Sequence, residues 1–247
     1  KTFQLGGNVA WDQAKAIRRV VGELAPVAVP RSLLREILNL PSSTGFDDPL
    51  ATSLAELQRL SLVEFDESQN PVAHRLVRTF ARHRNGIDNI SPIEVCATKL
   101  KDQFLKHFDN PDAATMHALE SLITHAEYIS TTANLAPDLA IRLASGIDGH
   151  HRAFGRYQAS KHFSQAALRL AQNSYASGHP LIASSKSNLG TVLKDLGELA
   201  EARELLRSAL ASYENIYAPG HPLIATSQSN LALLLSALGE LGEARDL

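Results

Sequence analysis

The sequence predicts a mainly all-α protein whose C-terminal part is an array of stacked helical hairpins. One observation is an internal repeat: a five-residue run that begins at His179 returns at His221, 42 residues later. Across residues 179–205 and 221–247, 18 of 27 positions are identical. A second observation is that leucine and alanine keep the spacing of an amphipathic helix within each copy. Such a repeat indicates one supersecondary unit stacked several times.

Each copy of the repeat is predicted to form two helices. Pro180 and Pro222 fit the first turn of the first helix, where a missing N–H costs nothing. Gly197 ends that helix, and a second helix follows with leucine and alanine on one face. Since one hairpin cannot bury both of its faces, it needs stacked neighbours. The residues expected to face solvent on the second helix include Glu198, Glu201 and Arg203.

A weaker third copy precedes these two. Gly155 and Gly178 lie 42 residues before Gly197 and Gly220. The array is therefore expected to have repeats at about 137–178 and 179–220 and an incomplete one at 221–247.

Residues 89–136 lack the repeat glycine, and we expect a degenerate helical repeat or linker helices there. The pairs Ser91-Pro92 and Asn110-Pro111 each place a capping residue before a first-turn proline. They predict two helix starts within this segment.

The repeat resembles the tetratricopeptide repeat, in the 42-residue variety of kinesin light chains. The resemblance rests on three runs, Gly178–Ala183, Ser187–Gly190 and Leu196–Ala202. It implies an α-α superhelix whose first helices line a concave groove that binds a protein or peptide. By this resemblance the groove-facing positions are Ser184, Ser187, Asn188, Thr191, Lys194, Thr226, Ser229, Asn230 and Leu233.

Asn188 and Asn230 recur at one position of the repeat. An asparagine amide can both donate to and accept from a peptide backbone, which gives a grip that tolerates different sequences. Hydrogen bonding of these asparagines within the array is the open alternative. The groove set mixes hydroxyls, amides and one lysine, so a polar protein or peptide is expected; nucleic acid would require several Arg or Lys.

Residues 1–88 are expected to form a different, smaller domain. Helices are predicted at about 11–24, 31–39, 49–60 and 75–84. Two short β-like runs, at 62–65 and 72–74, are joined by polar residues and predict a hairpin.

Three helices followed by a hairpin are the order of a winged-helix domain. The runs Leu57–Val63 and Val72–Arg78 resemble the winged-helix segment of STAND-class signalling NTPases, which include the NB-ARC proteins. In that family an NTPase core precedes the winged helix, and a repeat array that senses a ligand follows it. The resemblance therefore implies an absent NTPase domain of the same chain as a partner.

The same resemblance implies a role for His74, because a histidine at its position faces the phosphates of bound nucleotide in the family. The usual motif is Met-His-Asp, whereas this sequence has Ala73-His74-Arg75, and an ordinary hairpin residue is the alternative. The sequence has no Gly-x-x-x-x-Gly-Lys-Ser/Thr loop, so no cofactor is expected in this chain. ADP or ATP is expected only in a longer parent, of which a chain running from Lys1 to Leu247 would be a piece.

Composition argues against several other classes. The 24 basic and 26 acidic residues nearly balance, which gives no general attraction to nucleic acid or to a membrane surface. No apolar run is long enough to span a bilayer. Cys96 is the single cysteine, so a reducing, cytoplasmic setting is expected. No histidine spacing indicates a metal site, and no nucleophile motif indicates an enzyme.

A basic cluster at the end of the N-terminal segment leaves two further alternatives open. In a DNA-binding winged helix such residues could meet phosphates, which would make the protein a transcriptional regulator whose repeats sense an effector. Contact with an absent neighbouring domain is the interpretation preferred here, and a plain adaptor with no NTPase is the other alternative. The cluster consists of Arg75, Arg78, Arg82, His83 and Arg84.

Overall fold

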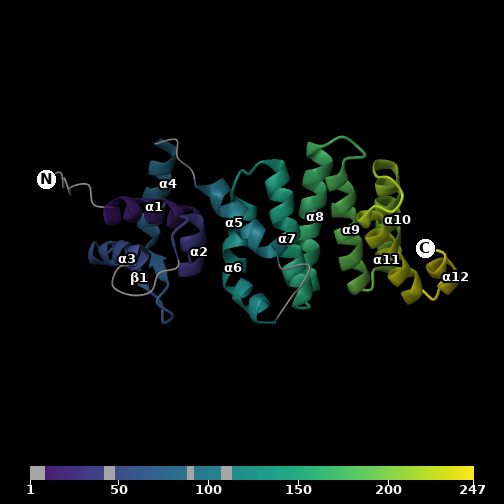
Figure 1. The fold of residues 1–247 in the computed structure, drawn as a ribbon, viewed down its shortest axis with the longest axis horizontal. Coiled ribbons are helices and arrows are strands. Elements are labelled where there is room, and N and C mark those ends of the chain that lie inside the picture. Colours follow the sequence, from purple (N-terminus) through teal and green to yellow (C-terminus); the bar gives the residue numbers. More distant parts are fainter. Residues whose placement is uncertain (1–8, 42–47, 88–91, 107–112) are drawn as a thin grey trace. The chain divides into compact units, whose positions relative to one another are not determined.

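The computed structural model describes residues 9–41, 48–87, 92–106 and 113–247 and confirms a mostly helical chain (Figure 1). The chain divides into two compact units. Unit 1 spans 1–103 and 111–135, and unit 2 spans 104–110 and 136–247.

Unit 1 carries its elements in the predicted order. Its elements are α1 (Val9–Glu23), α2 (Arg31–Ile37), α3 (Pro49–Arg59), β1 (Val63–Phe65), β2 (Pro71–Ala73), α4 (Arg75–Ile87), most of α5 (Ile93–Lys106) and α6 (Ala113–Thr132). The two strands pair antiparallel, with Val63 opposite Ala73. The predicted helices and hairpin of this segment are thus confirmed to within a few residues, while the winged-helix assignment stays a prediction. The predicted caps Ser91 and Asn110 lie outside the described residues.

Local signals explain where α3 begins. Asp48 caps the helix, since its carboxylate accepts a 3.0 Å hydrogen bond from the Leu50 N–H, and Pro49 occupies the first turn. Leu50, Leu54 and Leu57 then recur at helical spacing and are fully buried. The face of α3 that they form packs in the core of unit 1.

Two arginines of α4 hold the C-terminal end of α1. The guanidinium of Arg78 donates to the carbonyl of Leu24, and that of Arg82 donates to the carbonyl of Gly22 at 2.5 Å. Arg82 also donates to the Tyr128 hydroxyl of α6. Cations at a helix C-terminus satisfy its unpaired carbonyls and favour its dipole, so these contacts stabilise the junction of the three helices.

His125 of α6 binds the segment that joins α1 to α2. Its Nδ1 accepts from the Ala25 N–H at 3.2 Å, and its Nε2 lies 3.1 Å from the Ala28 carbonyl oxygen. Because an N–H can only donate and a carbonyl can only accept, the ring must be neutral with its proton on Nε2. The helix α6 therefore packs into unit 1, and the boundaries predicted at 88 and 136 stay predictions.

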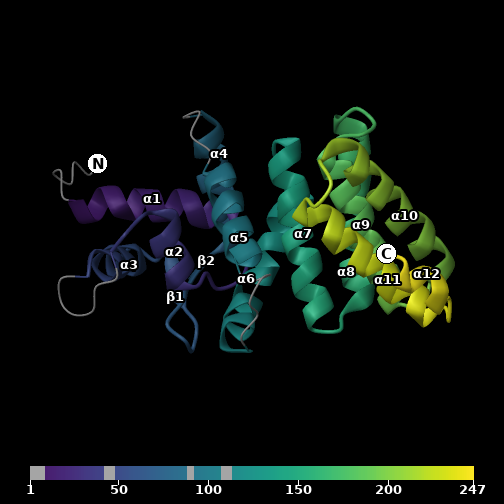
Figure 2. The same cartoon turned by 45° about the vertical axis from the view of Figure 1, so that its right-hand side comes forward.

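Unit 2 is a stack of helical hairpins, as both views of the molecule show (Figure 1, Figure 2). The hairpins are α7 (Pro137–Ala153) with α8 (Tyr157–Ser174), α9 (Pro180–Asp195) with α10 (Leu199–Ile216), and α11 (Pro222–Ala237) with α12 (Leu241–Arg245). Each hairpin packs on the next through leucine and alanine side chains. The predicted helices of the repeats are confirmed.

Small residues allow α9 and α10 to approach closely. A Cβ on Gly190 would lie 2.8 Å from Cγ of Leu206 and 3.3 Å from the carbonyl oxygen of Ala202, so no larger residue fits there without a shift. Gly197, which ends α9, has a φ of +80°, a conformation that glycine adopts without strain.

Candidate functional site

Histidine caps fix where the first helix of a repeat begins. Nδ1 of His179 accepts from the Leu181 N–H, and Nδ1 of His221 accepts from the Leu223 N–H, each at 3.2 Å. Each ring also stacks on a tyrosine four residues earlier, with centroid distances of 4.0 Å for Tyr175 and 3.9 Å for Tyr217. The predicted helix-start role of these histidines is confirmed, and it sets the same register for α9 and α11.

Ion pairs connect one repeat to the next. Nζ of Lys161 lies 2.6 Å from Glu198. The equivalent pair one repeat later, with each residue 42 positions further along, joins the guanidinium of Arg203 to Glu240. The prediction that Glu198 and Arg203 simply face solvent was therefore wrong: each is half-buried against the neighbouring hairpin. The spacing of Lys161, Arg203 and their partners could have revealed this pattern in the sequence.

The predicted groove residues of α9 differ in how far they are engaged. Ser184 donates to the Leu181 carbonyl at 3.2 Å, and the Thr191 hydroxyl donates to the Ser187 carbonyl at 2.9 Å. Ser187 and Thr191 are both nearly buried. Lys194 is half-buried, and its ammonium is 3.3 Å from Asp195.

The predicted groove residues of α11 are more open. Thr226 and Ser229 are exposed, and their hydroxyls donate to carbonyls one turn back, at 3.0 and 2.9 Å. Leu233 is 59% exposed on α11, the last full-length helix of the sequence, whereas its equivalent Thr191 on α9, with hairpins on both sides, is 9% exposed.

Asn188 and Asn230 are half-buried on α9 and α11. Neither side chain has a hydrogen bond or ion pair with any other part of the chain that the structure describes. The alternative in which these asparagines bond within the array therefore finds no contact here. Both amides remain available to an external donor or acceptor.

Two arginines of the basic cluster of α4, Arg78 and Arg82, are engaged inside unit 1. Arg78 is 7% exposed and, like Arg82, is engaged with carbonyls of unit 1. Burial lowers the pKa of Arg78, with Arg82 adding repulsion. The expectation that the cluster as a whole contacts a neighbouring domain or DNA was thus wrong for these two arginines, because they serve the interior; Arg75 and His83 are exposed.

His74 lies between β2 and α4 with its side chain exposed. Its Nδ1 accepts from the Leu76 N–H at 3.3 Å, as in the two repeat histidines. His74 therefore helps to cap α4, and its nucleotide-sensing role stays a prediction.

Other candidate chemistry finds little support. Burial raises the pKa of the Cys96 thiol to about 12, which disfavours the thiolate, the reactive form. Among the residues that the structure describes, no group of three or more His, Cys, Asp or Glu is placed to hold a metal ion. None of the helices described is both long and apolar enough to cross a bilayer.

The family-model comparison agrees with the geometry of unit 2. Residues 149–215 and 181–247 match the family model of the tetratricopeptide repeat, so the chain carries such repeats, which indicate a protein–protein interaction region. A solved structure, BtubC (BKLC) from P. vanneervenii, is 19% identical with a TM-score of 0.47, over 86% of this chain and 69% of that chain. No curated protein sequence matches the chain.

Proposed function

We propose that this chain is a non-catalytic protein-interaction and sensor segment, in which α9 and α11 bind a polar protein or peptide. Asn188 and Asn230 carry the proposal, because they occupy equivalent positions and their amides have no partner among the residues described. An amide without an internal partner keeps its full capacity to donate and accept. Leu233 supplies exposed apolar area beside them.

The chemistry of this face favours an extended peptide backbone as the ligand. Two amides in register can each hold one peptide unit by a pair of hydrogen bonds, which does not depend on side-chain identity. Lys194 is the single cation among the predicted groove residues, and its ammonium is already paired with Asp195. The groove therefore offers little positive charge to a polyanion such as nucleic acid.

Selection from a phage-displayed random peptide library tests this proposal. The wild-type chain is expected to enrich a consensus, and the variant Asn188→Ala/Asn230→Ala to bind the selected peptide at least about tenfold more weakly, the equivalent of one lost hydrogen bond or more. The matched control is Asn173→Ala/Asn215→Ala. This second asparagine pair also recurs 42 residues apart but lies exposed on α8 and α10. Equal affinity for both double variants would reject the groove assignment.

We further propose that the natural polypeptide carries an NTPase core before these helices, and that unit 1 relays between it and the repeats in the cytoplasm. A ligand on the repeats would move such a switch only by binding one state more tightly than the other. The element order of unit 1 supports this proposal: three helices, α1 to α3, are followed by the hairpin and α4. His74 lies exposed between the hairpin and α4.

Nucleotide content tests the switch. The full-length protein is purified without added nucleotide and denatured, and any released ADP or ATP is identified. Bound ADP that is lost on His74→Ala is the expected result. Absence of nucleotide would instead leave a plain adaptor, in which only the peptide-binding part of the proposal stands.

A further inference from the structure

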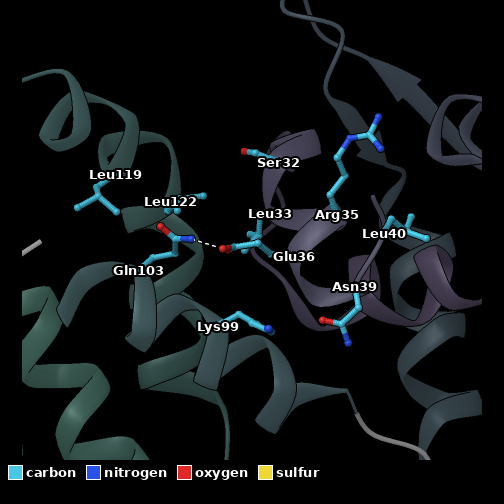
Figure 3. Close-up of a pocket in the computed structure, with 10 residues that line it drawn as sticks. All are labelled: Ser32, Leu33, Arg35, Glu36, Asn39, Leu40, Lys99, Gln103, Leu119 and Leu122. Atoms are coloured by element: carbon cyan, nitrogen blue, oxygen red, sulfur yellow. Dashed lines mark hydrogen bonds between the residues drawn. The ribbon is translucent and has the colours of Figure 1, made fainter. Parts of the chain in front are cut away.

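Unit 1 contains a cavity of about 540 Å³ that is distinct from the repeat face. Its walls come from α2 and the turn after it, from α5 and from α6 (Figure 3). The volume lies in the range of small-molecule sites in proteins. The lining residues are Ser32, Leu33, Arg35, Glu36, Asn39, Leu40, Lys99, Gln103, Leu119 and Leu122.

The floor of the cavity is apolar. Leu33, Leu119 and Leu122 line it and are themselves almost fully buried, and Leu40 is half-buried at the edge. A floor made of leucine accepts hydrocarbon and offers no polar partner. The leucines of the lining favour a bound molecule with an apolar part.

The rim carries one cation that lacks a protein partner. Lys99 is half-buried, and no hydrogen bond or ion pair joins its ammonium to any residue in the described ranges. Figure 3 shows the Lys99 side chain extending from α5 toward the side of the cavity that Asn39 occupies. Arg35, the second cation of the lining, is already bound to Asp48 and to the Pro41 carbonyl. Lys99 is thus the group available to an anion.

The rim also carries one carboxylate in a defined place. Glu36 accepts a hydrogen bond from the Gln103 amide, which connects α2 to α5 across the cavity (Figure 3). That bond orients the carboxylate, which keeps further lone pairs for a second donor. Asn39 stands at the next turn with a φ of +51°, as a helix-ending residue, and its side-chain amide also has no partner in the described parts of the chain.

We propose that this cavity binds an apolar α-amino acid, with its carboxylate at Lys99, its ammonium at Glu36 and its side chain on the leucine floor. Both rim charges are then matched. A purely apolar molecule would leave Lys99 desolvated and unpaired, and an anion without an amine would meet the Glu36 carboxylate as a like charge. Unit 1 is on this account a small-molecule sensor, independent of peptide binding by the repeats.

Isothermal titration of the chain with L-leucine and with L-phenylalanine tests the proposal. Saturable binding is expected, and Lys99→Met and Glu36→Gln should each weaken it by at least about tenfold through the loss of one charge pair. Lys101→Met is the matched control: it removes the same charge from α5, but Lys101 is paired with Asp102 and does not line the cavity. Its affinity should equal that of the wild type.

Two analogues separate the charges. The compound 4-methylpentanoate lacks the amine of leucine, and 3-methylbutylamine lacks its carboxylate. Both are expected to bind at least about tenfold more weakly than leucine. The proposal is overturned if neither amino acid binds saturably, if Lys99→Met binds like Lys101→Met, or if either analogue binds as tightly as leucine.

Discussion

The carboxylate of Asp148 accepts a hydrogen bond from the Ser160 hydroxyl, at the two positions where the next repeat has Gly190 and Ala202. Both members of the pair are buried. The first repeat thus joins α7 to α8 by a polar contact where the second relies on close backbone approach. A buried carboxylate makes this junction sensitive to pH, unlike its counterpart.

Replacing Asp148 by Asn is expected to stabilise the chain at neutral pH. Burial raises the pKa of Asp148 from 3.8 to about 6. As pH falls from about 6 to 4, the folded state binds a proton at Asp148 before the unfolded state does. The buried carboxylate therefore lowers the free energy of unfolding above pH 6, and this loss is recovered below pH 4. By about 1.4 kcal/mol per pKa unit, the cost is roughly 3 kcal/mol. Thermal unfolding at pH 7 should show a gain for Asp148→Asn that shrinks by pH 4. The exposed Asp138→Asn serves as the control on α7, and a gain independent of pH would contradict the account.

His125 predicts the opposite trend for unit 1. Burial lowers its pKa from 6.5 to about 4. The unfolded chain binds the proton first, so stability present above pH 6.5 is lost as pH falls toward 4, by roughly 3 kcal/mol. In urea, the free energy of unfolding of His125→Gln should lie below that of the wild type at pH 7, and this difference should shrink as pH falls toward 4, because Gln cannot titrate. Exposed His162→Gln should keep the wild-type profile. A difference between wild type and His125→Gln that does not change with pH would refute the role of the ring.

Gly190→Ala is expected to destabilise unit 2 although alanine favours helices. The added Cβ would lie 2.8 Å from Leu206, and overpacking of this kind costs about 1–3 kcal/mol. Gly242→Ala in α12 meets nothing within 4 Å and should be neutral or slightly stabilising. Chemical denaturation of the two variants gives the comparison. A Gly190→Ala protein as stable as Gly242→Ala would show that α9 and α10 do not require the close approach.

The stacked cap at His179 combines a hydrogen bond with a ring contact. His179→Ala removes both, His179→Asn restores the cap, and a Tyr175/His179 double-mutant cycle isolates the stack. We expect about 1 kcal/mol for the cap and 0.5–1.5 kcal/mol of coupling for the ring pair. If His179→Asn and His179→Ala have equal free energies of unfolding, His179 does not stabilise the helix by capping it.

Much of the fold was predictable because its signals are local. Prolines at helix starts, Gly197 at a helix end and the leucine spacing all act within a few residues of the chain. The roles of Arg78 and His125 were not predictable, since their partners are backbone groups of a distant segment, which carry no signature in the sequence. The cavity was missed for a similar reason: Glu36, Lys99 and Leu122 come from three helices that only the tertiary fold brings together.

For the predicted groove residues, the sequence predicts their register within the repeat but not their burial. The repeat placed Asn188 and Asn230 in one register, and this follows from identical caps at His179 and His221. Sequence repetition does not predict how far a side chain is buried, however. Thr191 is nearly buried, whereas the equivalent Leu233 is exposed to solvent. The exposure of a side chain depends on which neighbouring hairpins pack over it, and its position within the repeat does not specify these.

The most direct test of the central claim is the side-chain amide NMR spectrum of Asn188 and Asn230, recorded while the library-selected peptide is added. Engagement of the repeat face by the peptide backbone predicts saturable shifts of both NH2 groups, with Asn173 and Asn215 unchanged. Unmoved Asn188 and Asn230 signals in the presence of a bound peptide would contradict the claim and place the binding surface elsewhere on the chain.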